Sequence, residues 1–125
     1  MNGIILFAHG ARDPAWAVPF NRLQHLVAAQ HPDSHVGLAY LELMSPSLPT
    51  AVATLAAQGV SGISIVPLFL GPGAHLRQDF PRLVSELQAQ YPQIPLVPLP
   101  AMGESEALLH GIAEWIAHSL PDAPA

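Results

Sequence analysis

Apolar residues along this chain gather in two kinds of segment, and the two kinds alternate four times. The first kind is short and almost continuously apolar, a pattern typical of strands buried on both faces of a parallel sheet. These predicted strands span residues 3–8, 36–41, 62–67 and 95–99. Prolines crowd the last of them and cannot donate a hydrogen bond to a neighbouring strand, so we expect it at an edge of the sheet.

The second kind of segment is longer and repeats apolar residues every three or four positions, as one face of a helix does. The first such stripe consists of Trp16, Phe20, Leu23 and Val27, and the last of Leu109, Ile112, Ile116 and Leu120. Cap residues, prolines and glycines mark the limits of the predicted helices. The helices are expected to begin at Asp13–Pro14, at Ser45–Pro46 or Ser47, at Asp79 and near Gly103. The last three are expected to end at Gln58, before Pro92 and at Leu120.

Alternation of strand and helix predicts an α/β fold, in which helices cover both faces of a four-stranded parallel sheet through right-handed crossovers. A chain of 125 residues is the right size for one hydrophobic core, whereas two cores would each be marginal. We therefore expect a single domain over residues 1–120 and a frayed tail over residues 121–125.

Composition narrows the classes of function. Half of the residues are apolar and a tenth are charged, which excludes a disordered chain. Nine acidic residues, four arginines and no lysine give a net charge of −5, which disfavours nucleic acid and anionic membranes as partners. The absence of cysteine excludes disulfides, thiolate metal sites and cysteine nucleophiles. Because the chain has neither a membrane-length apolar run nor a basic leader, the expected location is the cytoplasm.

Candidate chemistry lies where the predicted strands end, since ligands of open parallel sheets bind beyond the carboxyl ends of the strands. Three successive strands are followed there by His9, Glu42 and His75. Two imidazoles and a carboxylate suit divalent iron, cobalt, nickel or zinc, and three protein ligands leave coordination positions open for substrate. Gly10 and Gly73, beside the histidines, allow the backbone to turn sharply and to approach a ligand closely.

Each of these residues also has a purely structural interpretation. His9 alone could bond to a loop carbonyl, and Glu42 alone could cap a helix, whereas their convergence with His75 at one edge favours a site. The remaining histidines are expected in a loop (His31 and His35) or on helix surfaces (His25, His110 and His118).

Three segments of the chain resemble the CbiX-type sirohydrochlorin chelatases, a branch of the chelatase superfamily that includes the ferrochelatases. Residues 6–14, LFAHGARDP, are similar to the HG[SA]R opening of that family. Residues 40–48 contain the LE and PSL elements of its second segment. Residues 66–81, VPLFLGPGAHLRQDFP, are similar to its third segment, P.FL..G.H...D.P. The three segments occur in the family's order across most of the chain.

The resemblance implies a half-length form of the two-domain ferrochelatases that inserts a divalent metal into sirohydrochlorin. Cobalt serves the cobalamin route, iron the sirohaem route and nickel the coenzyme F430 route, so the metal is a substrate, and no organic cofactor is expected. His9, Glu42 and His75 would be the catalytic metal ligands, with His75 or Glu42 accepting the pyrrole protons. Short members of the family pair as homodimers with the macrocycle between the two copies, and we expect the same here.

Two of the four arginines, Arg12 and Arg77, flank the predicted ligands. Guanidinium groups suit carboxylates, of which sirohydrochlorin carries eight, so both arginines are candidate tetrapyrrole contacts. Pairing with Asp13 and Asp79, or helix capping, is the alternative interpretation.

Two other functions compete with metal insertion. A carrier of metal or tetrapyrrole would use the same three ligands without turnover. Phosphoryl transfer through a phosphohistidine at His9 is less favoured, because Ala8 stands where such phosphatases have arginine and because cations are scarce.

Overall fold

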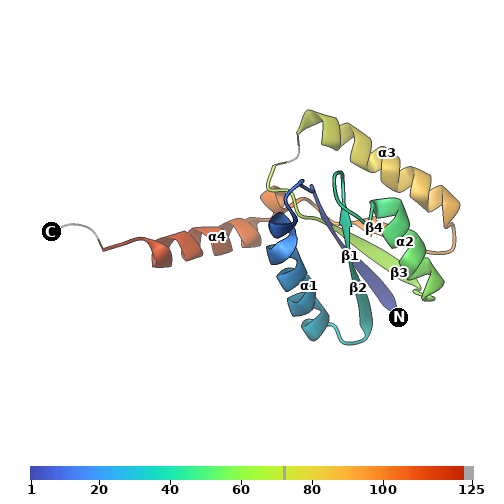
Figure 1. Cartoon of the computed structure of the whole chain (residues 1–125), viewed down its shortest axis with the longest axis horizontal. Helices are drawn as coiled ribbons and strands as arrows, with labels where there is room; N and C mark the ends of the chain where they lie inside the picture. Colours follow the sequence, from blue (N-terminus) through green and yellow to red (C-terminus); the bar gives the residue numbers. More distant parts are fainter. Residues whose placement is uncertain (72, 123–125) are drawn as a thin grey trace.

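Four parallel strands form one sheet in the order β2–β1–β3–β4 in the computed structural model of the chain (Figure 1). The structure describes residues 1–71 and 73–122, apart from the side chains of residues 74 and 75. The strands are β1 (Asn2–Ala8), β2 (Ser34–Tyr40), β3 (Gly62–Pro67) and β4 (Leu96–Pro98). These strands confirm the predicted parallel sheet, and β4, which pairs over only three residues, is the predicted edge strand. The end of the predicted tail, residues 123–125, lies outside the described residues.

In the described residues, four α-helices and two short 3₁₀ helices connect and follow the strands. They are η1 (Pro14–Ala17), α1 (Val18–Gln30), α2 (Leu48–Ala57), α3 (Ala74–Gln90), η2 (Met102–Glu104) and α4 (Glu106–Ser119). The predicted caps are in place: the Asp13 carboxylate accepts from the Ala15 N–H, and the Ser47 hydroxyl accepts from the Thr50 N–H. Gly59, with φ of +80°, follows α2 as predicted.

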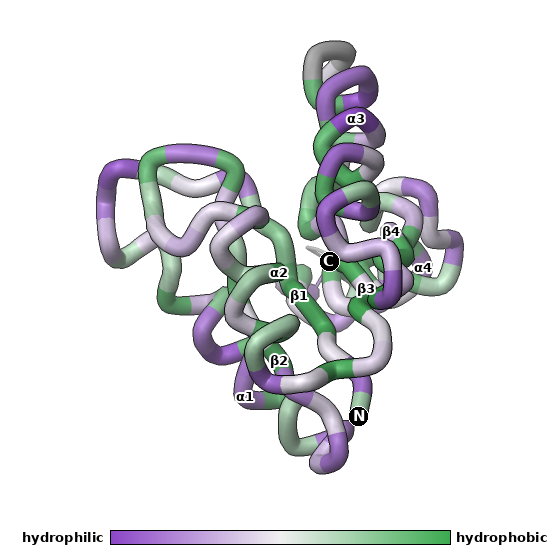
Figure 2. Tube along the Cα trace, turned by 90° about the vertical axis from the view of Figure 1, so that its right-hand side faces the viewer, coloured by the Kyte–Doolittle hydropathy of each residue, from purple (hydrophilic) through white to green (hydrophobic). Residues whose placement is uncertain are grey.

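The strand register divides the sheet into two faces. Leu6 pairs with Leu38 and with Val66, so these three side chains share the face on which α1 packs. Ile5 and Ile65 lie on the opposite face and belong to the main core beneath α2 and α3. Figure 2 shows apolar residues along the central strands β1 and β3, where both faces of the sheet need burial.

Phenylalanine rings tie β1 to α3 and to the loop after β3. The ring of Phe7 meets the ring of Phe69 edge-on, with a centroid distance of 5.6 Å, and stacks on Phe80 at 5.5 Å. Both distances fall in the range of favourable aromatic pairs. Phe7, near the end of β1, therefore holds α3 and the loop after β3 in place.

The predicted start of the third helix was wrong. We placed it at Asp79 because Pro81 is typical of a first helical turn. The observed α3 begins at Ala74 and keeps Pro81 inside it. Proline lacks the N–H that would bond to the Arg77 carbonyl. The helix continues past this gap because its apolar residues pack on the core, namely Leu76, Phe80, Leu83, Val84 and Leu87.

The last helix differs from the prediction in its surroundings. Its apolar stripe is present, and a 3₁₀ turn, η2, takes the place of its predicted first residues. However, no residue of α4 is buried, and the helix projects away from the sheet (Figure 1). Helices thus cover both faces of the sheet as predicted, but α4 is not one of them.

Within the described residues, none of the helices combines the length and the apolar character that a membrane crossing requires.

Gln88 joins the end of α3 to the start of β4. Its side-chain N–H groups donate to the carbonyls of Tyr91 (3.0 Å) and Ile94 (2.9 Å), and its carbonyl oxygen accepts from the Leu96 N–H (2.8 Å). One amide therefore satisfies three backbone groups of the connecting turn.

We expect Gln88→Ala to lower the free energy of unfolding by about 2 kcal/mol, because it leaves the partly buried Ile94 carbonyl and Leu96 N–H unpaired, whereas the Tyr91 carbonyl keeps its bond from the Ile94 N–H. Urea denaturation measures the loss. Gln90→Ala, an exposed glutamine of the same helix, is the matched control and should change stability by less than about 0.5 kcal/mol. Equal losses for the two variants would contradict the role assigned to Gln88.

Candidate functional site

Two of the predicted site residues meet at the carboxyl edge of the sheet. His9 follows β1 and Glu42 follows β2, and Nε2 of His9 lies 3.1 Å from Oε1 of Glu42. Backbone hydrogen bonds extend the strand pairing into these loops, from the Leu41 N–H to Ala8 (2.9 Å) and from the Glu42 N–H to His9 (3.1 Å). The two side chains are 56% and 55% exposed, so the pair is accessible to a ligand.

Gly10 lets the two loops approach each other. Its φ is +97°, a conformation that side chains disfavour, and a Cβ atom there would collide with the backbone carbonyl oxygen of Glu42. Gly10 therefore lies closely against the backbone of Glu42. The loop that carries the carboxylate depends on a glycine next to the histidine.

The loop after β2 is locally strained. Leu43 has a φ of +65°, unusual for a residue with a branched side chain, and the Met44 N–H donates to the Glu42 carbonyl (2.8 Å). Strain of this kind costs about 1–3 kcal/mol and occurs often at functional sites. Burial raises the pKa of the Tyr40 phenol at the end of β2, where Tyr40 packs with Ala8 and Ala17.

A cavity of about 390 Å³ contains the pair. Among the described residues, its lining consists of His9, Leu41, Glu42, Phe69, Gly71, Gly73, Leu76 and Asp79. The Phe69 ring stands edge-on to the His9 imidazole, with a centroid distance of 6.3 Å, and forms an apolar wall beside the polar pair.

Asp79 is a residue of this cavity that the sequence interpretation missed as a site residue. It lies one turn of α3 after His75, a spacing that brings two residues to one face of a helix. The signal was hidden because the predicted helix began only at Asp79. A helix that starts at Gly73, its observed N-cap residue, would have revealed it.

The third predicted ligand, His75, lies in the first turn of α3, directly after the loop that follows β3. Its side chain lies outside the described residues. In the part of the chain that the structure describes, no group of three or more acidic or histidine side chains is placed to hold a metal. The described part of the site is therefore the His9–Glu42 pair.

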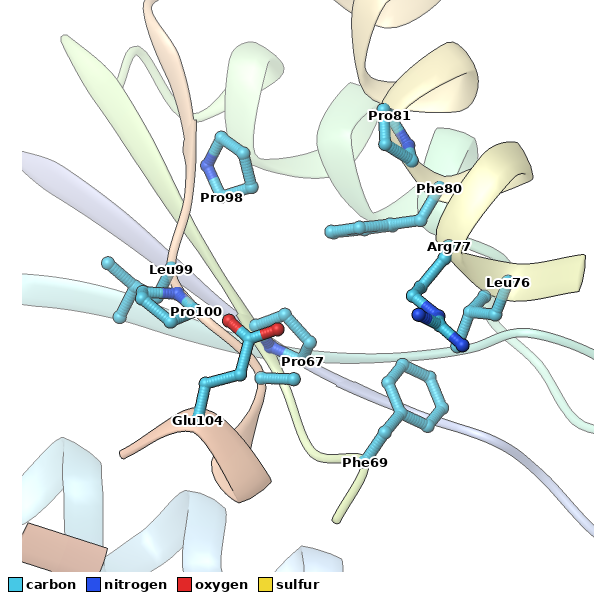
Figure 3. A pocket seen from close by; sticks show the side chains of 11 residues that line it. Pro67, Phe69, Leu76, Arg77, Phe80, Pro81, Pro98, Leu99, Pro100 and Glu104 are labelled. Carbon is cyan, nitrogen blue, oxygen red and sulfur yellow. The ribbon is translucent and has the colours of Figure 1, made fainter. Parts of the chain in front are cut away.

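A second cavity, of about 370 Å³, adjoins the first and shares Phe69 and Leu76 with it. Figure 3 shows Leu76, Phe69 and Phe80 on one side and Leu99 and Pro100 on the opposite side. Its charged lining residues are Arg77, which reaches into it from α3, and Glu104 of η2. A mainly apolar cavity with a few charged groups is typical of a site for a small organic ligand or cofactor.

The two candidate arginines differ in their position relative to the cavities. Both are exposed, and among the described residues Arg12 forms no ion pair with Asp13. The Asp13 carboxylate instead caps η1. Arg77 lines the apolar cavity, whereas Arg12, in the loop after β1, lines neither cavity.

Comparison with known proteins identifies the class of this α/β domain. The CbiX family model matches residues 3–119, nearly the whole chain. The chain therefore belongs to the CbiX family. A solved CbiX protein from Marinobacter aquaeolei VT8 is 32% identical and superposes with a TM-score of 0.82, over 94% of this chain and 96% of that one.

Curated relatives carry the name sirohydrochlorin cobaltochelatase. The one from Methanosarcina acetivorans is 32% identical over 83 residues, which cover 66% of this chain and 64% of the relative. The one from Saccharolobus solfataricus is 33% identical over 84 residues, covering 67% and 64%. The chain thus spans less than two thirds of the length of these relatives.

A longer protein, SirB from Bacillus subtilis with Fe³⁺, shares the fold with a TM-score of 0.78 and 21% identity. The match covers 96% of this chain but 48% of SirB. This match confirms the predicted fold, which corresponds to about half of the longer chain.

A pair of glycine variants tests the packing of the two loops. Gly10→Ala and Gly59→Ala both place a side chain at positive φ, which costs about 1–2 kcal/mol. Space is open around Gly59, whereas an added methyl group at Gly10 displaces the Glu42 backbone. We expect Gly10→Ala to cost about 1–3 kcal/mol more in urea denaturation and to shift the Glu42 amide resonance. Indistinguishable losses in the two variants would argue against this packing.

Proposed function

We propose that this protein is a chelatase that inserts a divalent metal, cobalt or iron, into sirohydrochlorin. The observation that carries the proposal is the accessible His9–Glu42 pair beside an apolar cavity that holds Arg77. Membership of the CbiX family and the names of the curated relatives support it.

His9, Glu42 and His75 are the proposed ligands of the incoming metal. Neutral imidazole and carboxylate together suit divalent first-row ions. The short contact between His9 Nε2 and Glu42 Oε1 places a nitrogen and an oxygen donor side by side. A ligand nitrogen must be unprotonated to coordinate, so metal binding displaces any proton that the pair shares.

Insertion exchanges one divalent ion for two pyrrole protons, so charge balances and the site must accept those protons. Glu42 and His75 are the proposed acceptors, because a ligand group becomes basic again once the metal has left it. Asp79 adds a further carboxyl group to the same cavity.

The macrocycle is proposed to lie against the apolar cavity. Aromatic rings of Phe69 and Phe80 suit its flat face, and Arg77 suits one of its carboxylates. Gly73 allows close approach of the backbone, and Arg12 is a further candidate for a carboxylate. One chain supplies one wall of such a site, so we also propose a homodimer that encloses the macrocycle between two copies.

Replacing the ligands should stop insertion. We expect His9→Ala, Glu42→Gln and His75→Ala each to lower the rate of Co²⁺ insertion by more than about 100-fold, since loss of even an outer-shell partner costs 10–100-fold. The visible spectrum of sirohydrochlorin follows the reaction, with the rate without protein subtracted, and circular dichroism checks the fold.

His25→Ala is the matched control for these ligand variants, because His25 lies exposed on α1 and bonds to the Asn21 carbonyl. It should keep the wild-type rate. A ligand variant with wild-type activity would remove that residue from the site. If the wild-type protein changes the spectrum only stoichiometrically, with Co²⁺, Fe²⁺ and Ni²⁺ alike, it is a carrier and the chelatase proposal fails.

Removal of Arg77 should weaken tetrapyrrole binding rather than chemistry. We expect Arg77→Ala to raise KM for sirohydrochlorin about tenfold with little change in kcat, because it deletes a charge-assisted contact. Steady-state kinetics at saturating Co²⁺ measure both constants. Arg22→Ala, which removes an exposed arginine of α1, is the control. A fall in kcat without a change in KM would contradict this role.

A further inference from the structure

In the described part of the chain, the outer edge of β2 leaves the backbone groups of Leu38 unpaired. β2 is an edge strand with β1 on one side. The bond from the Leu41 N–H to the Ala8 carbonyl, just beyond the strand, shows that the odd-numbered residues face β1. Because successive residues of a strand alternate in direction, Val36, Leu38 and Tyr40 turn their N–H and C=O groups away from β1.

Other groups of the chain occupy this edge on both sides of Leu38. The side-chain N–H of Gln24 donates to the Val36 carbonyl (2.8 Å), and the Tyr40 N–H donates to the Pro46 carbonyl (2.9 Å). No hydrogen bond joins the N–H or the C=O of Leu38 to another described residue. One donor and one acceptor therefore remain between two closed positions, and a long strand cannot pair along this edge.

A cavity of about 350 Å³ has Leu38 in its lining. Asn21 and Gln24 of α1 line one side of it, and Ala51 and Thr54 of α2 line the other. None of the described lining residues is charged, in contrast to the two cavities at the carboxyl edge. A neutral cavity with one backbone donor and one backbone acceptor suits a neutral ligand that offers the same two groups, as a peptide does.

Gly37 leaves open space beside Leu38. It pairs with Ile5, so a side chain at position 37 would lie on the sheet face that α2 covers. A Cβ atom there would meet no other atom within 4 Å. Glycine weakens the interior of a strand and often marks a site where a ligand or another backbone approaches closely. No described segment of this chain makes that approach, so the space is available to a ligand.

From these observations we infer that the β2 edge binds three residues of an extended, uncharged peptide segment of a partner protein. The central peptide residue exchanges both backbone hydrogen bonds with Leu38, as in a hydrogen-bonded pair of antiparallel strands. Its two neighbours turn their backbone groups away from β2, so they pass Gln24 and Pro46 without competing. A fourth residue at either end would need the Val36 carbonyl or the Tyr40 N–H, and both are already bonded.

The open space at Gly37 selects one side chain of the peptide. Residues that lie opposite each other in an antiparallel pair direct their side chains to the same face. The third peptide residue lies opposite Gly37 and therefore points toward α2. Ala51 and Leu55, two buried apolar residues of α2, line this part of the cavity, so a small apolar side chain fits there. Backbone bonds provide the affinity and this position the specificity, as in other peptides that add to a sheet edge.

Titration of the full chain with blocked tripeptides tests the site. The probe is acetyl-Ala-Thr-Val-amide, which carries no charge and places valine opposite Gly37. NMR spectroscopy of the ¹⁵N-labelled protein should show a saturable downfield shift of the Leu38 amide proton, with a Kd of about 1–10 mM for so few contacts. Acetyl-Ala-Pro-Val-amide is the matched control and should bind about tenfold more weakly, because its central residue has no N–H to donate.

A pair of protein variants tests the role of Gly37. Gly37→Val fills the open space and should weaken binding of the valine probe about tenfold. It should lose no stability in urea, because valine favours strands and meets no clash. His35→Val adds the same side chain to the same face of β2 but outside the cavity, and it should keep the wild-type affinity.

Three results would overturn the inference: no saturable shift with the valine probe up to about 50 mM, equal binding of the proline probe, or wild-type affinity of Gly37→Val. The inference is independent of the proposed function, since this cavity shares no described lining residue with the two cavities at the carboxyl edge. Gly37→Val should therefore insert Co²⁺ at the wild-type rate, so failure of peptide binding and failure of metal insertion are distinguishable.

Discussion

The structure depends on the pairing of β1 with two parallel neighbours. Because β1 lies between β2 and β3, its hydrogen-bonding groups are used on both sides, and its residues from Ile5 to Ala8 are buried. Parallel pairing brings the carboxyl ends of all three strands to one edge. The pairing continues beyond the strands, through Leu41 to Ala8, Glu42 to His9 and Leu68 to Phe7. A shift of one residue in this register would turn His9 to the opposite face of the sheet and separate it from Glu42.

The parts of the fold that were predictable follow from local periodicity. Continuous apolar runs located all four strands, and the prolines around β4 placed it at an edge. The start of α3 was not predictable from the same signals, since Pro81 is typical of a first turn and the packing that tolerates it inside a helix is tertiary. That difference hid the spacing between His75 and Asp79.

The candidate site was also predictable only in part. Strand ends sufficed to predict that His9 and Glu42 share an edge, since topology alone requires it. The contact of Gly10 with the Glu42 backbone and the positive φ of Leu43 are properties of two loops packed together, which no single segment encodes. Periodicity also located the apolar face of α4. It could not predict what that face packs against, because the spacing of apolar residues is the same whichever surface they cover.

A metal cation and a carboxylate-rich macrocycle need opposite charges at one site. A chain with a net charge of −5 attracts divalent cations and repels a carboxylate-rich macrocycle. Arg77, at the apolar cavity, supplies positive charge where a carboxylate would dock. The proposed homodimer presents this arginine twice across a site whose walls exclude water, where its attraction for carboxylates is strongest. For a short chain, the proposed association therefore serves electrostatics as well as shape: the second copy of the proposed homodimer both closes the cleft and doubles the positive charge offered to the proposed substrate.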